Sequence, residues 1–451
     1  MNDLTVIKEP VLLFRRVLRA PGYDAGAEYV RASWVVWTPV DGGVLALNTL
    51  TRELVLLEGI DSPDKADPAA LVAKRFWIPA GTDERKLIDE CKQTERLLHL
   101  EQTQKGLSAY TIFTTTDCNA RCFYCFEQGC DKLTMSRETA EEVAAFIART
   151  RNPDRRLVIH WFGGEPLVNA EAIDIVSRSL RERGIDFYST ATTNGYLFDE
   201  ATAERAVRDW RMTRVQITLD GTRERYNRIK AYVAAEDDPY ERVMGNIGAL
   251  LAKGMQVTIR LNLDAANGED LEALIDELGE RFGGAEKIRI YVKALYQLET
   301  SPDAAKRDAI RARQQQLDRR AAALLGKKKH GLSRALKYGA CIADSDSGTI
   351  ILPDGRLLCC EHLTERPMSY GTIWDDESDY DRSVLAWWKE REERIDACDG
   401  CFYAPMCYRI AHCPAQGPCW EGWRDQLREQ LDESMREEYN AYMCKSVQSL
   451  S

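Results

Sequence analysis

No run of 18 or more consecutive apolar residues occurs in the sequence, and a helix needs roughly that length to cross a bilayer. We therefore expect no membrane span. The opening residues, MNDLTVIKEPVLLF, lack a basic segment followed by a long apolar stretch, so no secretory signal is expected and a cytoplasmic location is predicted. Internal repeats and low-complexity tracts are also missing.

An excess of basic charge is missing as well. The chain holds 61 Lys and Arg against 72 Asp and Glu, which gives a formal net charge of −11. Binding of nucleic acid normally needs a basic face, so we expect no nucleic-acid partner. The short basic run Lys327–Lys329 is more typical of a solvated loop than of a binding patch.

Cysteine, by contrast, is abundant, with 14 residues. Cys91 and Cys444 are isolated, and the others form two groups. The groups contain Cys118, Cys122, Cys125 and Cys130, and then Cys341, Cys359, Cys360, Cys398, Cys401, Cys407, Cys413 and Cys419. A chain of this length without a secretory signal does not need disulfides to fold. Clustered cysteines in such a protein indicate metal ligands rather than scattered structural thiols.

The 451 residues are enough for two or three domains, and the pattern divides them into four segments. These are residues 1–105, 106–300, 301–337 and 338–451. In the first segment, turn residues separate three short strand candidates, and two helical patterns follow. The strands are Trp34–Thr38, Val44–Asn48 and Glu53–Leu57, and the helices are Ala69–Phe76 and Asp83–His99.

Residues 106–300 alternate strand and helix patterns. The strand candidates are Tyr110–Thr115, Leu157–Phe162, Phe187–Thr192, Arg214–Leu219, Gln256–Asn262 and Lys287–Lys293. The helical patterns are Ser136–Thr150, Ala170–Arg183, Ala201–Trp210, Tyr240–Lys253 and Glu269–Phe282. This order predicts an α/β fold with a parallel sheet and right-handed crossovers. Six units are too few for a closed eight-stranded barrel, so we expect a partial (β/α)6 TIM barrel with its site at the carboxyl ends of the strands.

The last two segments differ from the barrel. A polar helical pattern over residues 302–325 leads to a loop-rich, cysteine-dense region with short strands at Thr349–Leu352 and Arg356–Leu358. Such a region has little apolar core of its own. We therefore expect metal clusters to tie it together, as they do in small metal-binding domains.

The first cysteine motif, Cys118-x3-Cys122-x2-Cys125, follows the first barrel strand. Three thiolates on a [4Fe–4S] cluster leave one iron open. An open iron can chelate the amino and carboxyl groups of S-adenosylmethionine (SAM), whose reductive cleavage releases a 5′-deoxyadenosyl radical. Tetrahedral zinc, a structural four-cysteine cluster that includes Cys130, and a disulfide are the alternatives.

The motif and its surroundings resemble the radical SAM superfamily over the whole barrel. The matching features are Tyr124 before the third cysteine, Gly163-Gly164-Glu165-Pro166 (GGEP) after the second strand, Thr193-Asn194-Gly195 (TNG) after the third, Thr218-Leu219-Asp220-Gly221 after the fourth, and Arg260 on the fifth.

The resemblance implies a SAM-binding role for each feature. Tyr124 is expected near the adenine, and Thr193 and Asn194 at the SAM site. Gly163 and Gly164 would let the backbone approach the SAM ammonium, from which Glu165 can accept a hydrogen bond. Thr218 and Asp220 are expected at the ribose, and Arg260 at the SAM carboxylate.

The second cysteine group resembles the SPASM extension of radical SAM enzymes that modify peptides and proteins. The resemblance implies two auxiliary [4Fe–4S] clusters. Cys341, Cys360 and Cys413 would serve the first; Cys398, Cys401 and Cys407 would serve the second, completed by Cys419 or Cys444. Five residues precede Cys413 where the family usually has three, which leaves its assignment less secure.

The first auxiliary cluster has only three evident ligands in the sequence. This would leave an open iron able to bind a substrate thiolate, unless Cys359 or a remote cysteine closes it. His362 and His412 lie near ligand positions, and ordinary hydrogen bonding is the favoured role for both.

The order of elements in residues 1–105 resembles the RiPP recognition element, a winged-helix module that binds the leader of ribosomally made peptides. Such a module would take up an extended leader by strand addition; a plain packing domain is the alternative. The resemblances together imply a peptide maturase that abstracts hydrogen from a precursor peptide with a leader, with a donor such as flavodoxin or ferredoxin as reductant. A thioether is the favoured product, ahead of carbon–carbon or carbon–oxygen crosslinks.

Two other functions stay open. One is the oxidation of a protein Ser or Cys to formylglycine, as in anaerobic sulfatase-maturing enzymes. The other is a non-catalytic electron-transfer or scaffold role. The sequence does not identify a general acid or base, because the target atom of the substrate is unknown.

Overall fold

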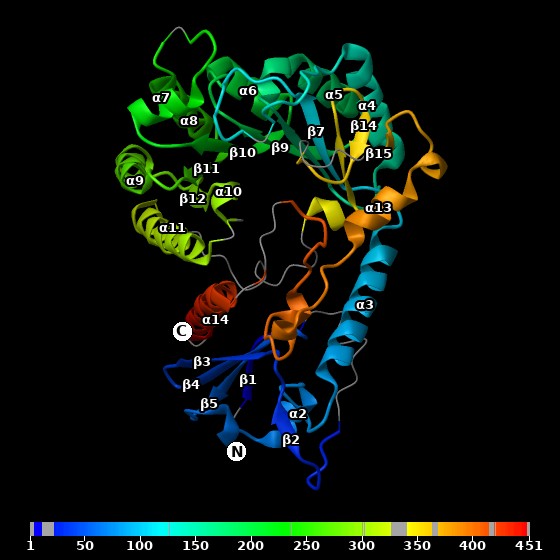
Figure 1. The fold of residues 1–451 in the computed structure, drawn as a ribbon, viewed down its shortest axis with the longest axis vertical. Helices are drawn as coiled ribbons and strands as arrows, with labels where there is room; N and C mark the ends of the chain where they lie inside the picture. Colours follow the sequence, from blue (N-terminus) through cyan, green and yellow to red (C-terminus); the bar gives the residue numbers. More distant parts are fainter. Residues whose placement is uncertain are drawn as a thin grey trace.

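The computed structural model describes residues 4–10, 22–125, 127–235, 237–299, 301, 303–325, 341–362, 369–414, 419 and 421–448. A large sheet with its helices forms one end of the molecule, and a smaller N-terminal sheet forms the other (Figure 1). Helix α3 (Glu84–Thr103) runs along one side between the two ends, and α14 (Glu421–Gln448) lies against the smaller sheet.

The N-terminal unit is built on a four-stranded antiparallel sheet of order β1-β5-β4-β3. Its strands are β1 (Leu4–Lys8), β3 (Val35–Val40), β4 (Gly43–Asn48) and β5 (Glu53–Glu58). Helix α2 (Pro68–Ala73) and a two-stranded ribbon of β2 (Tyr29–Arg31) and β6 (Trp77–Pro79) complete the unit. The three strands predicted as a meander and both predicted helices are present within a few residues of their expected bounds, whereas β1, β2 and β6 were not predicted.

The two faces of this sheet have different partners, because alternate side chains point to opposite sides. Val55 and Leu57 point toward the core formed with Phe76 and Ile78 of the same unit. Leu54 and its alternating neighbours point the other way and pack against C-terminal side chains. Those side chains are Met406, Leu431 and Met435, with Phe402, Tyr403 and Tyr439 partly buried beside them. The N-terminal unit therefore shares one of its two cores with the end of the chain.

The large sheet contains the predicted partial barrel. Six parallel strands lie side by side in chain order. They are β7 (Ala109–Thr115), β8 (Leu157–Gly163), β9 (Phe187–Thr193), β10 (Met212–Leu219), β11 (Gln256–Leu263) and β12 (Ile288–Ala294). The crossovers contain α4 (Arg137–Thr150), α5 (Ala170–Glu182), α6 (Glu200–Arg208), α7 (Arg223–Lys230), α8 (Pro239–Ala252) and α9 (Gly268–Phe282). The predicted fold class is confirmed; α7 was not predicted.

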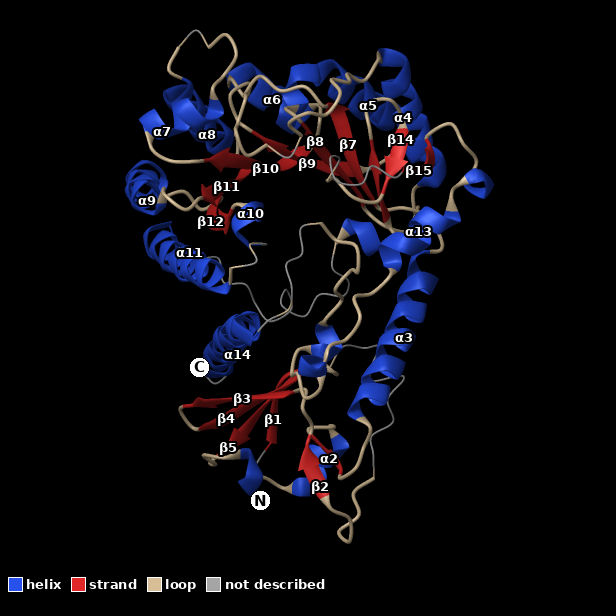
Figure 2. Ribbon diagram, viewed as in Figure 1, coloured by secondary structure: helices blue, strands red, loops and turns tan. Residues whose placement is uncertain are grey.

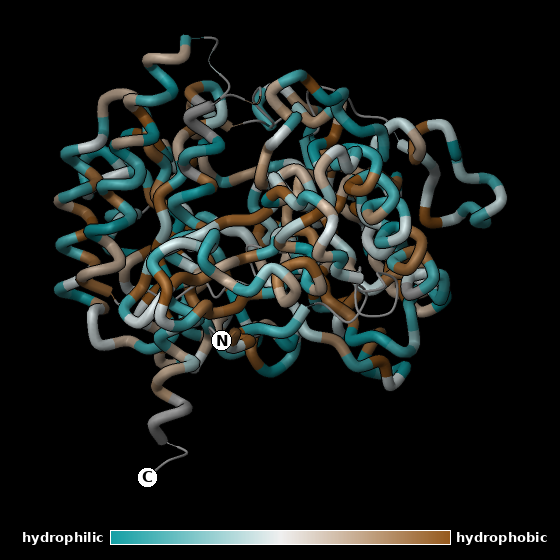
Figure 3. The backbone as a smooth tube through the Cα atoms, turned by 90° about the horizontal axis from the view of Figure 1, so that it is seen from below, coloured by the Kyte–Doolittle hydropathy of each residue, from teal (hydrophilic) through white to brown (hydrophobic). Residues whose placement is uncertain are grey.

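The helices cover one face of these strands (Figures 1 and 2). Alternate strand residues such as Val215, Ile217 and Leu219 are fully buried against them, as is Trp161. Hydrophobic segments gather toward the middle of the molecule, while the peripheral helices alternate between hydrophobic and hydrophilic residues (Figure 3). Ser136 caps α4 as predicted, because its side chain accepts a hydrogen bond from the backbone N–H of Thr139.

The C-terminal region continues the same sheet. Strand β13 (Gly348–Ile351) pairs in parallel with β7, and β14 (Arg356–Leu358) and β15 (Ser369–Thr372) follow in antiparallel order. The helices of the remaining chain are α10 (Tyr296–Glu299), α11 (Ala304–Leu325) and α13 (Arg382–Lys389). Single 3-10 turns lie at Pro63–Lys65, Pro166–Asn169, Ile342–Asp344, Glu377–Asp379, Asp396–Cys398 and Ala404–Met406. The long helix α14 contradicts the expectation that residues beyond 338 are mainly loop.

Within the described ranges, no helix combines the length and the apolar character that crossing a membrane requires.

The shared core gives a testable prediction about stability. Met435 is fully buried between α14 and the N-terminal sheet, so Met435→Ala should lower the free energy of unfolding by about 2–5 kcal/mol through loss of contacts and a residual cavity. Thermal unfolding of the reconstituted protein measures the effect. Met443→Ala on the same helix is the matched control, because that side chain is 41% exposed. Equal losses in the two variants would contradict the shared core.

Candidate functional site

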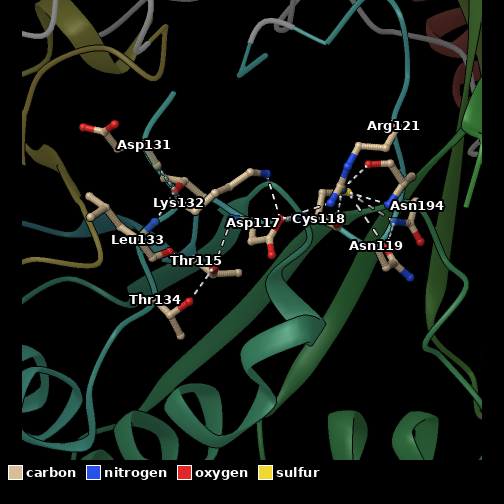
Figure 4. A network of polar contacts seen from close by, with 12 residues as sticks. Thr115, Asp117, Cys118, Asn119, Arg121, Asp131, Lys132, Leu133, Thr134 and Asn194 are labelled. Carbon is tan, nitrogen blue, oxygen red and sulfur yellow. Dashed lines mark hydrogen bonds and ion pairs between the residues drawn. The ribbon is translucent and has the colours of Figure 1, made fainter. Parts of the chain in front are cut away.

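The first cysteine loop leaves the carboxyl end of β7 and is braced by a returning segment (Figure 4). Asp117 accepts a hydrogen bond from the backbone N–H of Cys118 at 2.8 Å and forms an ion pair with Lys132 at 2.7 Å. Thr115 Oγ1 accepts from Asp117 N at 3.0 Å and donates to the carbonyl of Leu133 at 2.8 Å. Residues 131–134 thus fix the point from which the three cysteines start.

The three thiols of this loop lie close enough to influence one another. Burial raises the pKa of Cys118 to about 12, and the charges of Glu165, Cys122 and Cys125 add to the effect. Burial also raises the pKa of Cys125. These thiols therefore hold their protons unless a bound cation stabilises the thiolates, as iron does.

Three thiolates from one loop are the ligand set of an iron–sulfur cluster with one open iron. Among the described residues, no three His, Cys, Asp or Glu side chains converge so that they could hold one metal ion. A four-iron cluster puts each thiolate on a different iron, so its ligands stand further apart than those around one ion.

Two glycines bring the end of β8 against the cysteine loop. A Cβ on Gly163, whose φ is +121°, would lie 2.1 Å from the carbonyl oxygen of Thr115. A Cβ on Gly164 would lie 2.3 Å from that of Asp117. The backbone N–H groups of Gly164 and Glu165 donate to the same two carbonyls at 3.1 and 2.9 Å. The contact between the two loops therefore requires glycine at positions 163 and 164. The sequence had predicted that these glycines are needed for the approach of SAM.

Glu165 is fully buried and connects the ends of two strands. Its carboxylate accepts hydrogen bonds from Thr193 Oγ1 at 2.8 and 3.0 Å, from Asn194 N at 2.7 Å and from Leu167 N at 3.2 Å. Burial raises its pKa to about 7, although these donors oppose the rise. Both oxygens accept hydrogen bonds from the chain, and the contact of Glu165 with the SAM ammonium stays a prediction.

Asn194 continues this connection to the cysteine loop (Figure 4). Its Nδ2 donates to Asn119 Oδ1 at 2.6 Å and lies 3.8 Å from Cys118 Sγ. Its Oδ1 accepts from Tyr196 N at 3.0 Å. The GGEP and TNG motifs thus form one hydrogen-bonded unit with the cysteine loop.

A buried ion pair lies on the other side of the loop. Lys230 Nζ is 3.0 Å from Asp220 Oδ2, and the two side chains are only 3% and 1% exposed. Tyr124 donates its hydroxyl hydrogen to Asp220 Oδ1 at 2.6 Å, and Asn262 donates to the same oxygen at 3.0 Å. Burial alone would lower the pKa of Lys230, but Asp220 and other neighbours raise it well above its ordinary value.

Sequence analysis did not select Lys230. It is the last residue of a polar helix, and nothing in that pattern distinguishes it from exposed lysines. The carbonyl of Lys230 also accepts from Arg121 N at 2.8 Å, which ties the end of α7 to the cysteine loop.

Thr218 and Arg260 lie one layer deeper in the barrel. In the strand register Thr218 is opposite Arg260, which is opposite Tyr291. Arg260 donates from Nε to Asn262 Oδ1 at 3.0 Å, so it joins the network around Asp220. The predicted ribose and carboxylate contacts thus face the same side of the sheet.

The second group of cysteines separates into two sets in space. Burial raises the pKa of Cys360 to about 12, and the charges of Cys341 and Cys413 add to this rise. Cys413 therefore lies near the first set despite its unusual spacing. Cys359 is 8% exposed and packs into the barrel core. Among the described cysteines, Cys341 alone affects the pKa of Cys359.

The other set surrounds Cys419. Burial raises the pKa of Cys419, and Cys407, Cys398 and Cys401 contribute to the rise. Cys444 lies exposed near the end of α14. The sequence left Cys419 and Cys444 open as the fourth ligand of the second auxiliary cluster. In the structure Cys419 lies near the other cysteines of this set, whereas Cys444 lies near the end of α14.

The remaining candidates have packing or hydrogen-bonding roles. Cys130 packs beside the small core of Phe113 and Phe162. His412 stacks on Trp387 with ring centres 3.8 Å apart and bonds Glu390 at 2.7 Å.

The Cys419 set lies against the N-terminal unit. Lys92 of α3 donates to the carbonyl of Cys407 at 2.7 Å, and Thr49 donates to the carbonyl of Phe402 at 2.6 Å. Arg85 forms an ion pair with Asp399 at 2.7 Å. The N-terminal unit therefore supports the segment that carries these cysteines.

Comparison with known proteins assigns the barrel. Residues 112–278 match the model of the Radical SAM superfamily. These residues form a radical SAM domain. The cofactors of that superfamily are a [4Fe–4S] cluster and SAM, and the cysteine loop, with its three separated thiols and adjoining glycine turn, suits them.

Curated relatives match part of the chain. A probable GTP 3′,8-cyclase of Methanocaldococcus jannaschii is 34% identical over 116 residues, which is 26% of this chain and 37% of the relative. The GTP 3′,8-cyclase of Erythrobacter litoralis is 28% identical over 179 residues, or 38% of this chain and 51% of the relative. The chain thus spans between about a third and a half of these relatives.

Solved structures share the fold over a larger part of the chain. Native anSMEcpe with bound AdoMet aligns with a TM-score of 0.52 at 15% identity, covering 74% of this chain and 99% of that one. Streptococcus suis SuiB bound to the precursor peptide SuiA aligns with a TM-score of 0.50 at 13% identity, covering 84% and 95%. At these identities the likeness concerns the fold.

The buried pair beside the cysteine loop gives a second prediction. Asp220→Asn leaves the ammonium of Lys230 buried without its counter-charge, so the free energy of unfolding should fall by about 3–5 kcal/mol. The double variant Asp220→Asn with Lys230→Met removes both charges and should recover much of that loss. Thermal unfolding of the three proteins tests this. A double variant no more stable than the single one would show that the pair is not the cause.

Proposed function

We propose that the chain is a radical SAM peptide maturase that forms a thioether within a ribosomally made precursor peptide. The main support is the gathering of cysteines into three separate groups. One lies at the carboxyl end of β7, and two lie in the segment between the barrel and the N-terminal sheet. A radical SAM domain needs only the first group for SAM cleavage, so two more groups indicate further redox chemistry.

In this proposal Cys118, Cys122 and Cys125 hold the SAM-binding cluster. Cys341, Cys360 and Cys413 hold one auxiliary cluster, and Cys398, Cys401, Cys407 and Cys419 hold the other. When bound, the SAM-binding cluster with SAM supplies a 5′-deoxyadenosyl radical, and an auxiliary cluster on three protein thiolates leaves one iron open to a thiolate from outside the chain.

The chain's own residues position these groups. Glu165 holds the ends of β8 and β9 together, and Asn194 extends that contact to Cys118. Lys230 and Asp220 fix the hydroxyl of Tyr124, which in this proposal lies beside the adenine. These buried polar contacts prepare the site before SAM arrives, so less conformational freedom is lost when it binds.

The N-terminal unit would bind the leader segment of the peptide at the edge of its sheet. The two edge strands are β3 and β1. On β3, Arg428 donates to the carbonyl of Trp37, and Pro39 has no N–H to offer. β1 has a partner strand on one side only among the described residues, so we assign leader binding to the outer edge of β1.

The test uses anaerobically reconstituted protein, dithionite, SAM and small Cys-containing peptides encoded beside its gene. One SAM and one peptide should give one methionine, one 5′-deoxyadenosine, one proton and a peptide that is lighter by two hydrogens. Fragmentation by mass spectrometry should place the link at a cysteine, and a Cys→Ser peptide should remain unmodified.

Two outcomes would contradict this function. A crosslink in the Cys-free peptide would exclude the thioether. GTP conversion without any peptide modification would place the chain with its curated relatives in activity as well as in sequence.

The auxiliary assignment gives a further prediction. Cys419→Ser should lower the iron content by about four atoms per chain, because one cluster loses a ligand. Cys444→Ser should leave the iron content unchanged, since Cys444 lies 23 residues beyond the start of α14 at Glu421, roughly 35 Å along the helix at about 1.5 Å per residue. Iron analysis and Mössbauer spectra of both variants measure this, and the opposite pattern would transfer the ligand role to Cys444.

A further inference from the structure

The inner face of the barrel sheet carries a second chemical pattern. Along each strand, the side chains that alternate with the buried outer residues line this face. In register, His160 lies opposite Thr190, Thr190 opposite Arg214, and Arg214 opposite Gln256. The next row runs from Thr192 through Gln216 and Thr258 to Arg289.

Hydrogen bonds confirm that these side chains face one another. His160 bonds Thr190 Oγ1 at 2.7 Å and Thr192 Oγ1 at 3.1 Å. Tyr291 donates to Gln216 Oε1 at 2.9 Å. The amide of Gln256, with its oxygen turned toward β12, accepts from Arg289 at 2.9 and 3.2 Å.

The charges on this face have one sign. The inner positions of the six barrel strands include Arg214, Arg260, Arg289 and Lys293. Arg156 comes just before β8, and by the alternation of that strand it belongs to the same face. None of the inner positions of these strands is Asp or Glu. The whole chain, by contrast, carries a net charge of −11.

Three of these arginines, Arg156, Arg214 and Arg289, form no ion pair with a carboxylate of the described residues. Arg156 stacks on Tyr188, with the guanidinium carbon 4.4 Å from the ring centre. Arg289 bonds only the neutral Gln256. Arg214 is exposed.

Arginines on the outer helices behave differently. Arg205 pairs with Asp174, Arg281 with Glu241 at 2.9 Å, and Arg320 with Asp276 at 2.5 Å. These three outer arginines are thus neutralised by carboxylates of the chain, whereas Arg156, Arg214 and Arg289 pair with none of the described carboxylates. Unpaired guanidinium groups on a shared face are suited to carboxylates from a ligand, which they bind through two parallel hydrogen bonds.

The position of the three arginines separates them from the SAM site. All three lie near the amino-terminal ends of their strands, below the layers of Thr218–Arg260–Tyr291 and of Asp220–Asn262. The cysteine loop lies at the opposite, carboxyl end of the sheet.

We propose that Arg156, Arg214 and Arg289 bind an acidic stretch of the substrate peptide that lies several residues away from the residue that is modified. This inference rests on the proposed function and specifies its substrate as a peptide with several Asp or Glu residues. Because the rest of the chain is acidic, such a peptide is repelled elsewhere and attracted at this face.

The spacing favours a peptide over a nucleotide. Arg214 and Arg289 lie on strands two apart, so their backbones are separated by roughly 10 Å. Carboxylates three residues apart on a polyproline II segment lie on one side of the peptide with about that separation, at about 3.1 Å per residue. The adjacent phosphates of one nucleotide lie much closer together.

The test measures binding of a labelled peptide to the full-length reconstituted protein by fluorescence anisotropy. The probe is a Gly/Ser peptide with Glu at every third position, and its Gln analogue is the neutral comparison. We expect the Glu peptide to bind at least tenfold more tightly than the Gln peptide, and salt to weaken it. Arg214→Gln and Arg289→Gln should each weaken it about fivefold, as loss of one charged hydrogen-bonding partner does.

Arg183→Gln is the matched control. It changes the net charge by the same amount, lies exposed on the outer side of the barrel after α5, and should bind the Glu peptide as the parent does. Equal weakening in all three variants, or equal binding of Glu and Gln peptides, would overturn the proposal. Displacement of the Glu peptide by GTP, with GTP binding lost in Arg214→Gln, would assign the face to a nucleotide instead.

Failure of this inference is distinguishable from failure of the proposed function. Release of 5′-deoxyadenosine without peptide should be the same in the parent and in all three variants, because the arginines lie away from the cysteine loop. If a peptide is crosslinked while the Glu probe shows no preference for the parent, the inference fails alone. If no peptide is ever crosslinked, the proposed function fails whatever the probe does.

Discussion

The site depends on one close approach between backbones, that of the glycine turn after β8 to the cysteine loop after β7. Gly164 lies so near the carbonyl of Asp117 that no side chain can be accommodated. Glu165, held in place by this turn, then reaches Thr193 and Asn194 at the end of the next strand. Asn194 in turn reaches Cys118. Three strand ends are thus locked together by hydrogen bonds that are shielded from water, where each unsatisfied group would be costly.

The sequence predicted the barrel well because each strand has a strict pattern. Buried residues such as Val257, Ile259 and Leu261 alternate with polar ones, and turn residues end each segment. The cysteine spacing predicts a cluster at the first loop, since three thiolates leave one iron of a cluster open. Both predictions rest on local pattern and local chemistry.

Other features depend on partners that are distant in the chain. The 28 residues of α14 are mostly polar, and only a few, such as Leu431 and Met435, reach the core, so their helical pattern is weak. Lys230 becomes distinctive only because Asp220 and Tyr124 enclose it. The grouping of Cys413 with Cys360 likewise depends on folding, because their separation along the chain carries no information about distance in space.

The pairing of β13 with β7 links two regions that the sequence treated as separate. Gly348 lies opposite Ala109 and Ile351 opposite Ile112; Cys118 follows β7, whereas Cys341 precedes β13 and Cys360 follows β14. The backbone hydrogen bonds between β13 and β7 therefore fix the positions of the two cysteine groups relative to each other along the strand direction. A slip of one residue would move one group by about 3.3 Å against the other and turn every β13 side chain to the wrong face. Insertions in the turn between β13 and β14 leave this ladder intact, whereas a single residue added within β13 would change the spacing between the two cysteine groups.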